Sequence, residues 1–240
     1  MYKRLARTFT IIYPEEPTMI VYPSACGNVD ALIGGGFPTE ALSHVYGEPG
    51  TGKTALCLQL ATTVIRSDKR AIFITTDRFP GSRFTQIAGE ESEILAQKLI
   101  VFEVKSFDDQ RVTLQKVKKI AKENVGLIVF DTITTYYRLE QAKGNEAMLR
   151  DRLVNHVLSL LGLARKYDLA AVATNQVYAD LETGQTLPVA GSVLDNVSTL
   201  VIQLIKTDTQ RRCATLKKRG ISPRGEYTYF KITDEGLVDA

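Results

Sequence analysis

The sequence is poor in several features that would define its class. Only three of its 240 residues are cysteines. Cys26, Cys57 and Cys213 lie far apart without metal-ligand spacing, so we expect reduced thiols. No apolar run is long enough to span a membrane, and the apolar stretch near the N-terminus is too short for a signal peptide. We therefore expect a cytoplasmic protein with no membrane segment.

A large charge excess is also missing. The chain has 30 Lys and Arg against 27 Asp and Glu, a formal net charge of +3, which does not by itself indicate nucleic-acid binding. Any DNA site must come from local clustering of cations. With 44% hydrophobic and 24% charged residues, the composition is that of an ordinary globular domain. We find no internal repeat and no low-complexity tract.

The first 19 residues differ from the rest of the chain. They are basic and then carry Pro14 and Pro17 around two glutamates. This segment is either a flexible arm or the result of an upstream start codon, with Met19 opening the functional chain. We expect residues 20–240 to form a single core.

Apolar strand patterns alternate with helical patterns over most of the chain. The predicted strands are 42–47, 71–76, 127–131 and 169–176, and the predicted helices are 53–66, 84–97, 107–123 and 146–166. Strands separated by helices imply right-handed crossovers and a mostly parallel twisted sheet flanked by helices, an α/β fold. Three further strand patterns with short links predict a C-terminal antiparallel extension, at 199–206, 212–218 and 227–233.

Residues 47–54 read G-E-P-G-T-G-K-T and lie between a predicted strand and a predicted helix. A glycine-rich loop in this position turns backbone N–H groups toward phosphates, and the helix N-terminus adds a favourable dipole. We expect Lys53 to reach the β- and γ-phosphates of ATP and the Thr54 hydroxyl to bind Mg²⁺. The alternative is a glycine-rich turn that merely starts a helix. The predicted ATP-binding residues are Gly47, Glu48, Pro49, Gly50, Thr51, Gly52, Lys53, Thr54 and Ala55.

Two aspartates follow predicted strands. Asp131 closes "LIVFD", where it is expected to hold Mg²⁺ together with Thr54. Asp77 closes "FITTD" and is a candidate for aligning the attacking water with the γ-phosphate. The alternative for Asp77 is a solvated acid in a turn.

Four segments resemble the RecA/RadA recombinase family. They are "GNVDALIGGGFPTEALSHVYGEPGTGKT" (27–54), "DTITTYYR" (131–138), "TNQV" (174–177) and "VAGSVLDNVSTLVIQL" (189–204). In the family they correspond to the opening of the core, the metal strand with the first DNA loop, the switch strand, and the segment after the second DNA loop. The chain looks most like the archaeal paralogue that consists of a bare core. The resemblance implies a RecA-like P-loop NTPase core.

The same resemblance assigns further roles. Gln176 becomes the switch residue that senses the γ-phosphate, so the catalytic set is Lys53, Asp77 and Gln176. Loops 138–147 and 178–190 become the DNA loops. The candidate DNA contacts are Tyr137 (or Tyr136), Arg138, Lys143 and Arg150. Guanidinium groups fit phosphates and tyrosine rings stack on bases; the alternative is a solvated basic loop with core tyrosines.

The sequence departs from the family in ways that affect function. Asp77 stands where active recombinases carry Glu, and a carboxylate shorter by one methylene implies slow hydrolysis. The stretch before Arg83, the candidate adenine contact, is shorter than usual. The second DNA loop is acidic at Asp180 and Glu182, which disfavours an anionic strand there. The Phe-x-x-Ala polymerisation motif is absent from residues 1–20.

In related recombinases a C-terminal residue completes the nucleotide site of the neighbouring protomer. Lys217 and Lys218 are the candidates here, and an exposed basic turn is the alternative. The two histidines, His44 and His156, show no sign of a partner, and we expect both to be structural.

The resemblance implies an accessory or mediator protein of DNA repair and homologous recombination, with ATP and Mg²⁺ as cofactors and weak DNA-dependent ATPase activity. Its expected partners are single-stranded DNA, a RadA-type recombinase, a second copy in a homodimer and, by resemblance alone, a Holliday-junction resolvase. One alternative is an active, filament-forming strand-exchange recombinase. Another is a KaiC-like signalling ATPase, although such proteins typically carry paired glutamates at Thr76-Asp77.

Overall fold

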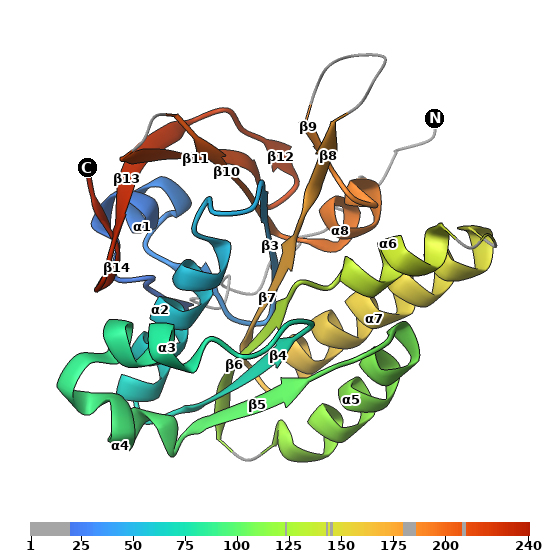
Figure 1. Cartoon of the computed structure of the whole chain (residues 1–240), viewed down its shortest axis with the longest axis horizontal. Coiled ribbons are helices and arrows are strands. Elements are labelled where there is room, and N and C mark those ends of the chain that lie inside the picture. The colour runs from blue at the N-terminus through green and yellow to red at the C-terminus, as the bar shows by residue number, and fades with distance from the viewer. Residues whose placement is uncertain (1–19, 123, 143, 145, 180–185, 208–209) are drawn as a thin grey trace, which may run out of the picture.

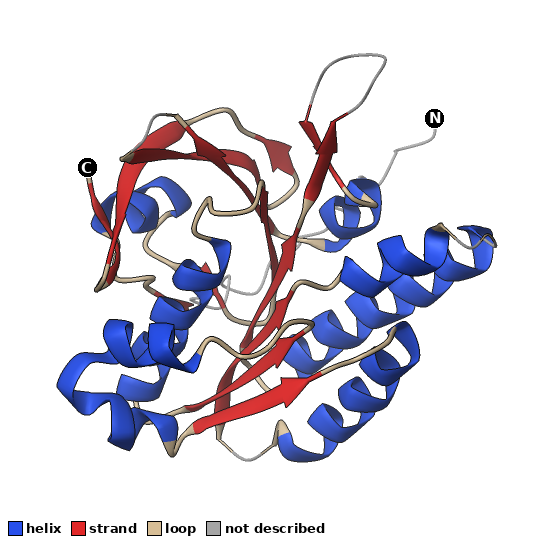
Figure 2. Cartoon of the chain, viewed as in Figure 1, coloured by secondary structure: helices blue, strands red, loops and turns tan. Residues whose placement is uncertain are grey.

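The structure, a computed structural model, describes residues 20–122, 124–142, 144, 146–179, 186–207 and 210–240. A ten-stranded twisted sheet runs through them, with helices on both faces (Figures 1 and 2). At its C-terminal end the sheet curves around α1 (Gly27–Ile33) and α2 (Lys53–Arg66). The predicted α/β class with an antiparallel C-terminal extension is confirmed.

The remaining elements complete this arrangement. The other described helices are α3 (Gly81–Ala88), α4 (Ser92–Ala96), α5 (Phe107–Ile120), α6 (Thr135–Gln141), α7 (Glu146–Lys166) and α8 (Gly191–Val197), with a 3-10 turn at Gly89–Glu91. The main sheet contains β3 (Leu42–Gly47), β4 (Arg70–Thr75), β5 (Leu99–Glu103), β6 (Val125–Asp131), β7 (Ala170–Asn175), β10 (Leu200–Lys206), β11 (Arg211–Arg219), β12 (Ser222–Pro223), β13 (Tyr227–Thr233) and β14 (Gly236–Asp239). Two small antiparallel two-stranded sheets pair β1 (Val21–Tyr22) with β2 (Phe37–Pro38) and β8 (Val177–Ala179) with β9 (Thr186–Pro188).

The strand order places the functional segments at one edge of the sheet. It reads β14-β13-β11-β10-β3-β7-β6-β4-β5, with β12 on β11. From β10 to β5 the pairs are parallel, so the carboxyl ends of β3, β4, β6 and β7 point the same way. In open parallel sheets ligands bind at this edge.

Apolar side chains cover both faces of the central strands. Every residue of β3, β6 and β7 is buried, as expected for parallel strands between two helical layers. One core lies under α1, α2 and α3, and the other lies under α5 and α7. The three cysteines are free thiols and buried, which confirms the expectation from their spacing.

Several elements differ from the sequence-based predictions. The helix predicted at 84–97 is broken into α3 and α4, because Gly89 adopts a φ of 63° in the left-handed region where helices end. Strand β5 was not predicted, because its apolar run from Leu99 to Phe102 is short and directly follows a predicted helix, and periodicity alone does not separate a short apolar run from a helical segment. Residues 135–141 form α6 and α7 begins at Glu146, so both ends of the predicted first DNA loop, 138–141 and 146–147, are helical.

The buried amide of Gln59 joins α2 to the C-terminal strand. Its Nε2 donates to the carbonyl oxygens of Leu237 at 3.0 Å and Ala25 at 3.2 Å, and its Oε1 accepts from the Leu237 N–H at 2.8 Å. The amide therefore satisfies both backbone groups of Leu237 in a site without solvent.

We expect Gln59→Leu to lower the free energy of unfolding by about 1–3 kcal/mol, because it leaves buried backbone groups unpaired. Urea denaturation measures this value. Gln115→Leu, at an exposed position of α5, is the control and should change it by less than about 0.5 kcal/mol. Equal stability of the two variants would contradict the role of Gln59.

Candidate functional site

The phosphate loop joins β3 to α2 and lies close to β10. A Cβ built at Gly47 would be 2.2 Å from the carbonyl oxygen of Leu204, so only glycine permits this approach. Gly52, directly before α2, has a φ of 102°, which other residues rarely adopt. The two glycines thus fix the course of the loop at both of its ends.

Lys53 is the first residue of α2, and its side chain folds back into the phosphate loop. Its Nζ donates to the carbonyl oxygens of Gly47 at 2.7 Å and Glu48 at 2.9 Å, and the residue is buried. Burial lowers the pKa of Lys53, while the negative charge of Asp131 acts in the opposite direction. The ammonium group is held where a phosphate chain cradled by the loop would run.

Asp131 lies at the end of β6, opposite the first turn of α2. The Thr54 hydroxyl donates to its Oδ2 at 2.6 Å, and the Thr174 hydroxyl donates to its Oδ1. Burial raises the pKa of Asp131, and these two hydrogen bonds oppose the shift. A carboxylate and a hydroxyl oxygen in contact form the kind of ligand set that Mg²⁺ prefers. The site therefore fits Mg²⁺ bound by Thr54 and Asp131.

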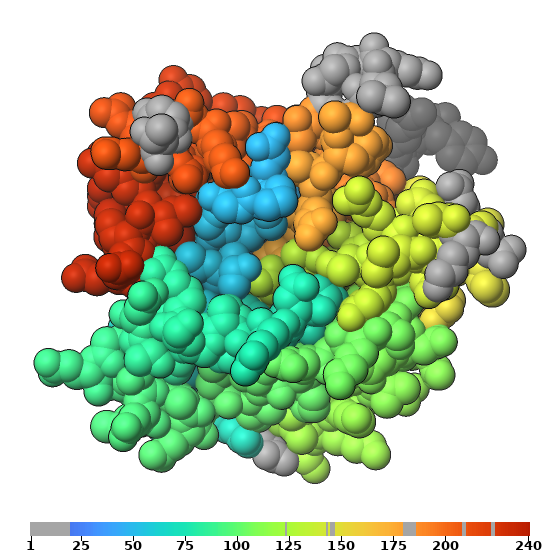
Figure 3. All heavy atoms as spheres, viewed as in Figure 1, coloured from blue at the N-terminus to red at the C-terminus, as the bar shows by residue number. Residues whose placement is uncertain are grey.

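One cavity of about 630 Å³ brings the predicted nucleotide residues together. It is lined by Pro49, Gly50, Gly52, Lys53, Thr54, Ala55, Asp77, Arg83, Asp131, Thr132, Gln176, Arg212 and Ile232. Figure 3 shows the loop residues near position 50 on the surface, between the C-terminal strands and the segment that follows β4. Predictions from five separate stretches of sequence thus converge on one site.

The outer residues of this cavity have distinct environments. Asp77 is exposed just after β4, and Gln176 is half-buried at the end of β7. Arg83 donates to the carbonyl oxygens of Thr233 at 2.6 Å and Asp234 at 2.9 Å. It therefore ties α3 to the turn between β13 and β14 at the rim of the cavity.

Sequence reasoning missed three residues at this site, Lys206, Arg212 and Ile232. Arg212 and Ile232 line the cavity, and Lys206 lies against Gly50. All three belong to the C-terminal strands. They reach the loop because β10 pairs with β3, and no local pattern in the sequence predicts that pairing.

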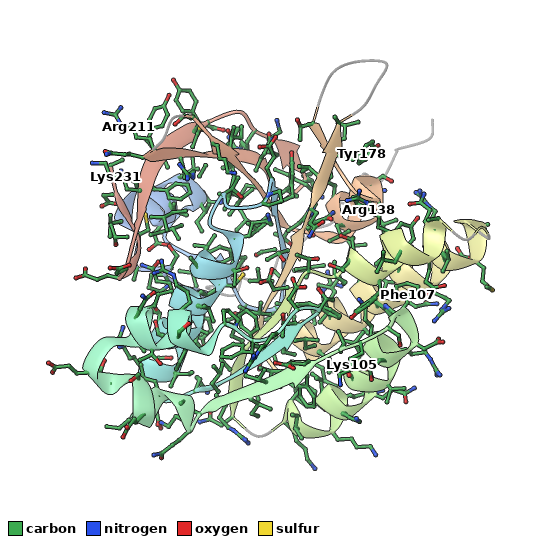
Figure 4. All side chains as sticks on the ribbon, in the orientation of Figure 1. Lys105, Phe107, Arg138, Tyr178, Arg211 and Lys231 are labelled. Atoms are coloured by element: carbon green, nitrogen blue, oxygen red, sulfur yellow. The ribbon has the colours of Figure 1, made fainter. Side chains whose placement is uncertain are left out.

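A second, larger hollow of about 1040 Å³ lies where the two predicted DNA loops meet. Its lining includes Arg138 of α6, Arg150 of α7 and Tyr178 of β8. Figure 4 shows Arg138 and Tyr178 on neighbouring elements of the same region. Arg150 also donates to the Ser192 hydroxyl at 3.2 Å. Two cations and an exposed ring in one groove match the requirements of single-stranded nucleic acid.

One predicted DNA contact, Tyr137, is nearly buried. Tyr137 is 5% exposed and packs edge-to-face on Phe107 with ring centroids 6.2 Å apart. Tyr137 lines the groove, but its nearly buried ring exposes little surface to a base. Tyr178, 46% exposed, is the more exposed aromatic residue in the groove. Lys143, Asp180 and Glu182 lie outside the described residues.

Lys217 and Lys218, the candidates for contact with a neighbouring protomer, lie in different environments. The ammonium group of Lys218 donates to the carbonyl oxygen of Asp195 at 2.5 Å, so it is engaged within its own chain, and its candidacy is not supported. Lys217 is exposed. Of the two histidines, buried His44 does have a partner, since its Nδ1 lies 2.7 Å from Oδ1 of Asp195. His156 packs on Phe107.

The loop after β3, the carboxylate at the end of β6 and the order of strands define a P-loop nucleotide-binding core of the RecA-like class. Among the residues described, no helix combines the length and apolar character that crossing a membrane requires.

The comparisons identify the group within this class. The sequence profile of the Rad51 family matches residues 17–240. A "DNA repair and recombination protein RadB" of Methanococcoides burtonii is 41% identical over 215 residues, 89% of this chain and 96% of that protein. One from Archaeoglobus fulgidus is 34% identical over 220 residues, 91% and 98% of the two chains.

A solved structure agrees with these matches. The "Crystal structure of the RadB recombinase" superposes with a TM-score of 0.78 at 31% identity, covering 91% of this chain and 99% of that one. The chain belongs to the Rad51 family. The bare-core resemblance noted from the sequence is to these archaeal RadB proteins, and it is confirmed.

The buried carboxylate of Asp131 makes stability depend on pH. Because burial raises its pKa above the ordinary value of 3.8, this group favours folding when protonated, and that contribution is lost as pH rises through the folded-state pKa. Near neutral pH, without nucleotide or Mg²⁺, we expect Asp131→Asn to be at least as stable as the wild type. The difference should vanish at acid pH. Urea denaturation across pH checks this, and a deficit that is constant with pH would contradict it.

Proposed function

We propose that this chain is an ATP-binding accessory protein of DNA repair and homologous recombination that binds single-stranded DNA and uses the nucleotide as a conformational switch. ATP and Mg²⁺ are its cofactors. Family membership and the names of its relatives support the recombination role. The finer assignment rests on one connection between the nucleotide cavity and the basic groove.

That connection is the Asn175–Gln176 pair at the end of β7. Gln176 lines the nucleotide cavity, and its carbonyl oxygen accepts from the Val189 N–H at 3.0 Å. The Asn175 Nδ2 donates to the Val189 carbonyl oxygen at 2.7 Å, and Val189 lines the groove. A shift of Gln176 toward a γ-phosphate would therefore move a wall of the groove. This is the observation that carries the proposal.

The partners follow from the family and stay proposals. We propose a RadA-type recombinase as the main protein partner, a Holliday-junction resolvase as a further one, and a homodimer as one form of the chain. Residues 20–240 act as a single core, and the protein works in the cytoplasm. Arg138 and Arg150 contact phosphates of the single strand, and Tyr178 replaces Tyr137 as the stacking residue.

The function is tested by measuring the affinity for a fluorescent single-stranded oligonucleotide without nucleotide, with ATP and with ADP. For a switch we expect ATP to change the affinity of the wild type by at least about fivefold, the lower end of usual coupling energies, at slow turnover. Lys53→Ala should abolish that difference. Strong stimulation of turnover by DNA would instead indicate an active recombinase. Wild-type protein that binds no oligonucleotide would refute the proposal.

The length of the side chain at position 77 is expected to limit hydrolysis. A misplacement of about one ångström costs on the order of a hundredfold in rate. We therefore expect Asp77→Glu to raise ATP turnover by about tenfold or more, and Asp77→Asn to lower it. Phosphate release under saturating ATP and Mg²⁺ measures both. Unchanged turnover in Asp77→Glu would show that another step or residue limits the rate.

A further inference from the structure

The hairpin of β10 and β11 brings two cations to the apex of the phosphate loop. Lys206 ends β10 and is paired with Arg212 in the antiparallel register. The Nε of Arg212 donates to the carbonyl oxygen of Gly50 at 3.3 Å. A Cβ built at Gly50 would lie 3.3 Å from Nζ of Lys206. Both side chains therefore lie at the phosphate loop of their own chain.

The two cations occupy different sides of the loop. Arg212 is half-buried and lines the cavity that also contains Lys53, Asp131 and Gln176. Lys206 lines a smaller hollow between the loop and β8, together with Glu48 and Tyr178. Arg212 thus faces the space for the nucleotide, and Lys206 flanks the loop from outside.

The negative charges at the nucleotide site favour further cations beside Lys53. A triphosphate brings several negative charges, and the site already holds the carboxylates of Asp131 and Asp77. Lys53 and one divalent ion offset only part of this charge. A guanidinium group suits the remainder, because its planar set of donors matches two phosphate oxygens at once.

In this structure the lysines suggested for contact with a neighbouring nucleotide give little support to a shared site. Alternate residues of β11 face opposite sides of the sheet. A register shift between Val201 and Ile202 breaks this alternation, so Lys218 pairs with Val201 and lies on the side opposite to Arg212. There it is bound to the Asp195 carbonyl, while Lys217 is exposed.

We propose that Arg212 binds the phosphates of the nucleotide held in its own chain, with Lys206 as a second cation beside the loop, so that the site acquires its cations without a neighbouring subunit. This assignment rests on the ATP binding proposed above. It makes Arg212 a phosphate-binding residue and predicts an ATP affinity that does not depend on protein concentration.

The test is titration of the full chain with a fluorescent ATP analogue and Mg²⁺ over a wide range of protein concentrations. Arg212→Gln is compared with Arg212→Lys and with Arg211→Gln. Arg211 is the matched control, because it is the adjacent arginine on the opposite, outer side of β11 (Figure 4). Competition with unlabelled ADP and AMP reports which phosphates are involved.

We expect Arg212→Gln to weaken ATP binding by about tenfold or more, as for the loss of a hydrogen bond between charged groups. Arg212→Lys should recover part of the loss, and Arg211→Gln should stay within about twofold of the wild type, as for an exposed substitution away from the site. Because the contact is to the phosphates, the loss should be larger for ATP than for AMP, and the dependence of ATP affinity on salt should decrease.

Three results would overturn the assignment. Equal ATP affinity of wild type and Arg212→Gln would remove the contact. An equal loss for ATP and AMP would show that Arg212 only supports the loop through Gly50. A wild-type affinity that increases with protein concentration would show that a neighbouring copy is needed. A wild type that binds no ATP at all would refute the proposed function itself, which separates the two failures.

Discussion

The carboxylate of Asp131 joins three parts of the chain that are distant in sequence. It ends β6, accepts from Thr54 at the start of α2, and accepts from Thr174 near the end of β7. A buried carboxylate is costly unless hydrogen bonds or a cation compensate it, so these hydroxyl groups are required where they are. The Thr54 hydroxyl and the Asp131 carboxylate are also the two groups proposed to bind Mg²⁺. The start of α2, the end of β6 and the end of β7 are therefore joined through one buried carboxylate.

The order of the strands explains why so many functional groups meet there. β3 lies between β7 and β10, so the loop that follows β3 has the switch residue Gln176 on one side and the C-terminal hairpin on the other. The close approach of Gly47 to Leu204 shows how tightly the hairpin is joined to the loop. Lys206 and Arg212 reach the loop through this strand pairing alone.

Local patterns in the sequence predicted much of the fold and of the nucleotide site. The strand before the loop, the helix after it and the strand ending in Asp131 all have strong apolar patterns, and the residues expected at the phosphates do line one cavity. Contacts set by tertiary pairing were not predictable in the same way. The position of Arg212 beside the phosphate loop could be recognised only from the register of β10 and β11. Tyr137 looked like a loop residue because the short helix α6, which turns its ring toward Phe107, has no strong periodic pattern.

The geometry favours a switch over a motor for a physical reason. Gln176 and Asn175 hold Val189 through two hydrogen bonds, and the proposed switch uses this connection to link the nucleotide cavity to the groove within one chain. On the proposed assignment of Arg212, the site needs no filament to bind ATP, and the short carboxylate of Asp77 is expected to slow hydrolysis. Together these two expectations give a long-lived ATP-bound state in a single subunit. The proposed accessory function needs such a state, because the chain would have to keep one conformation while it holds a DNA strand.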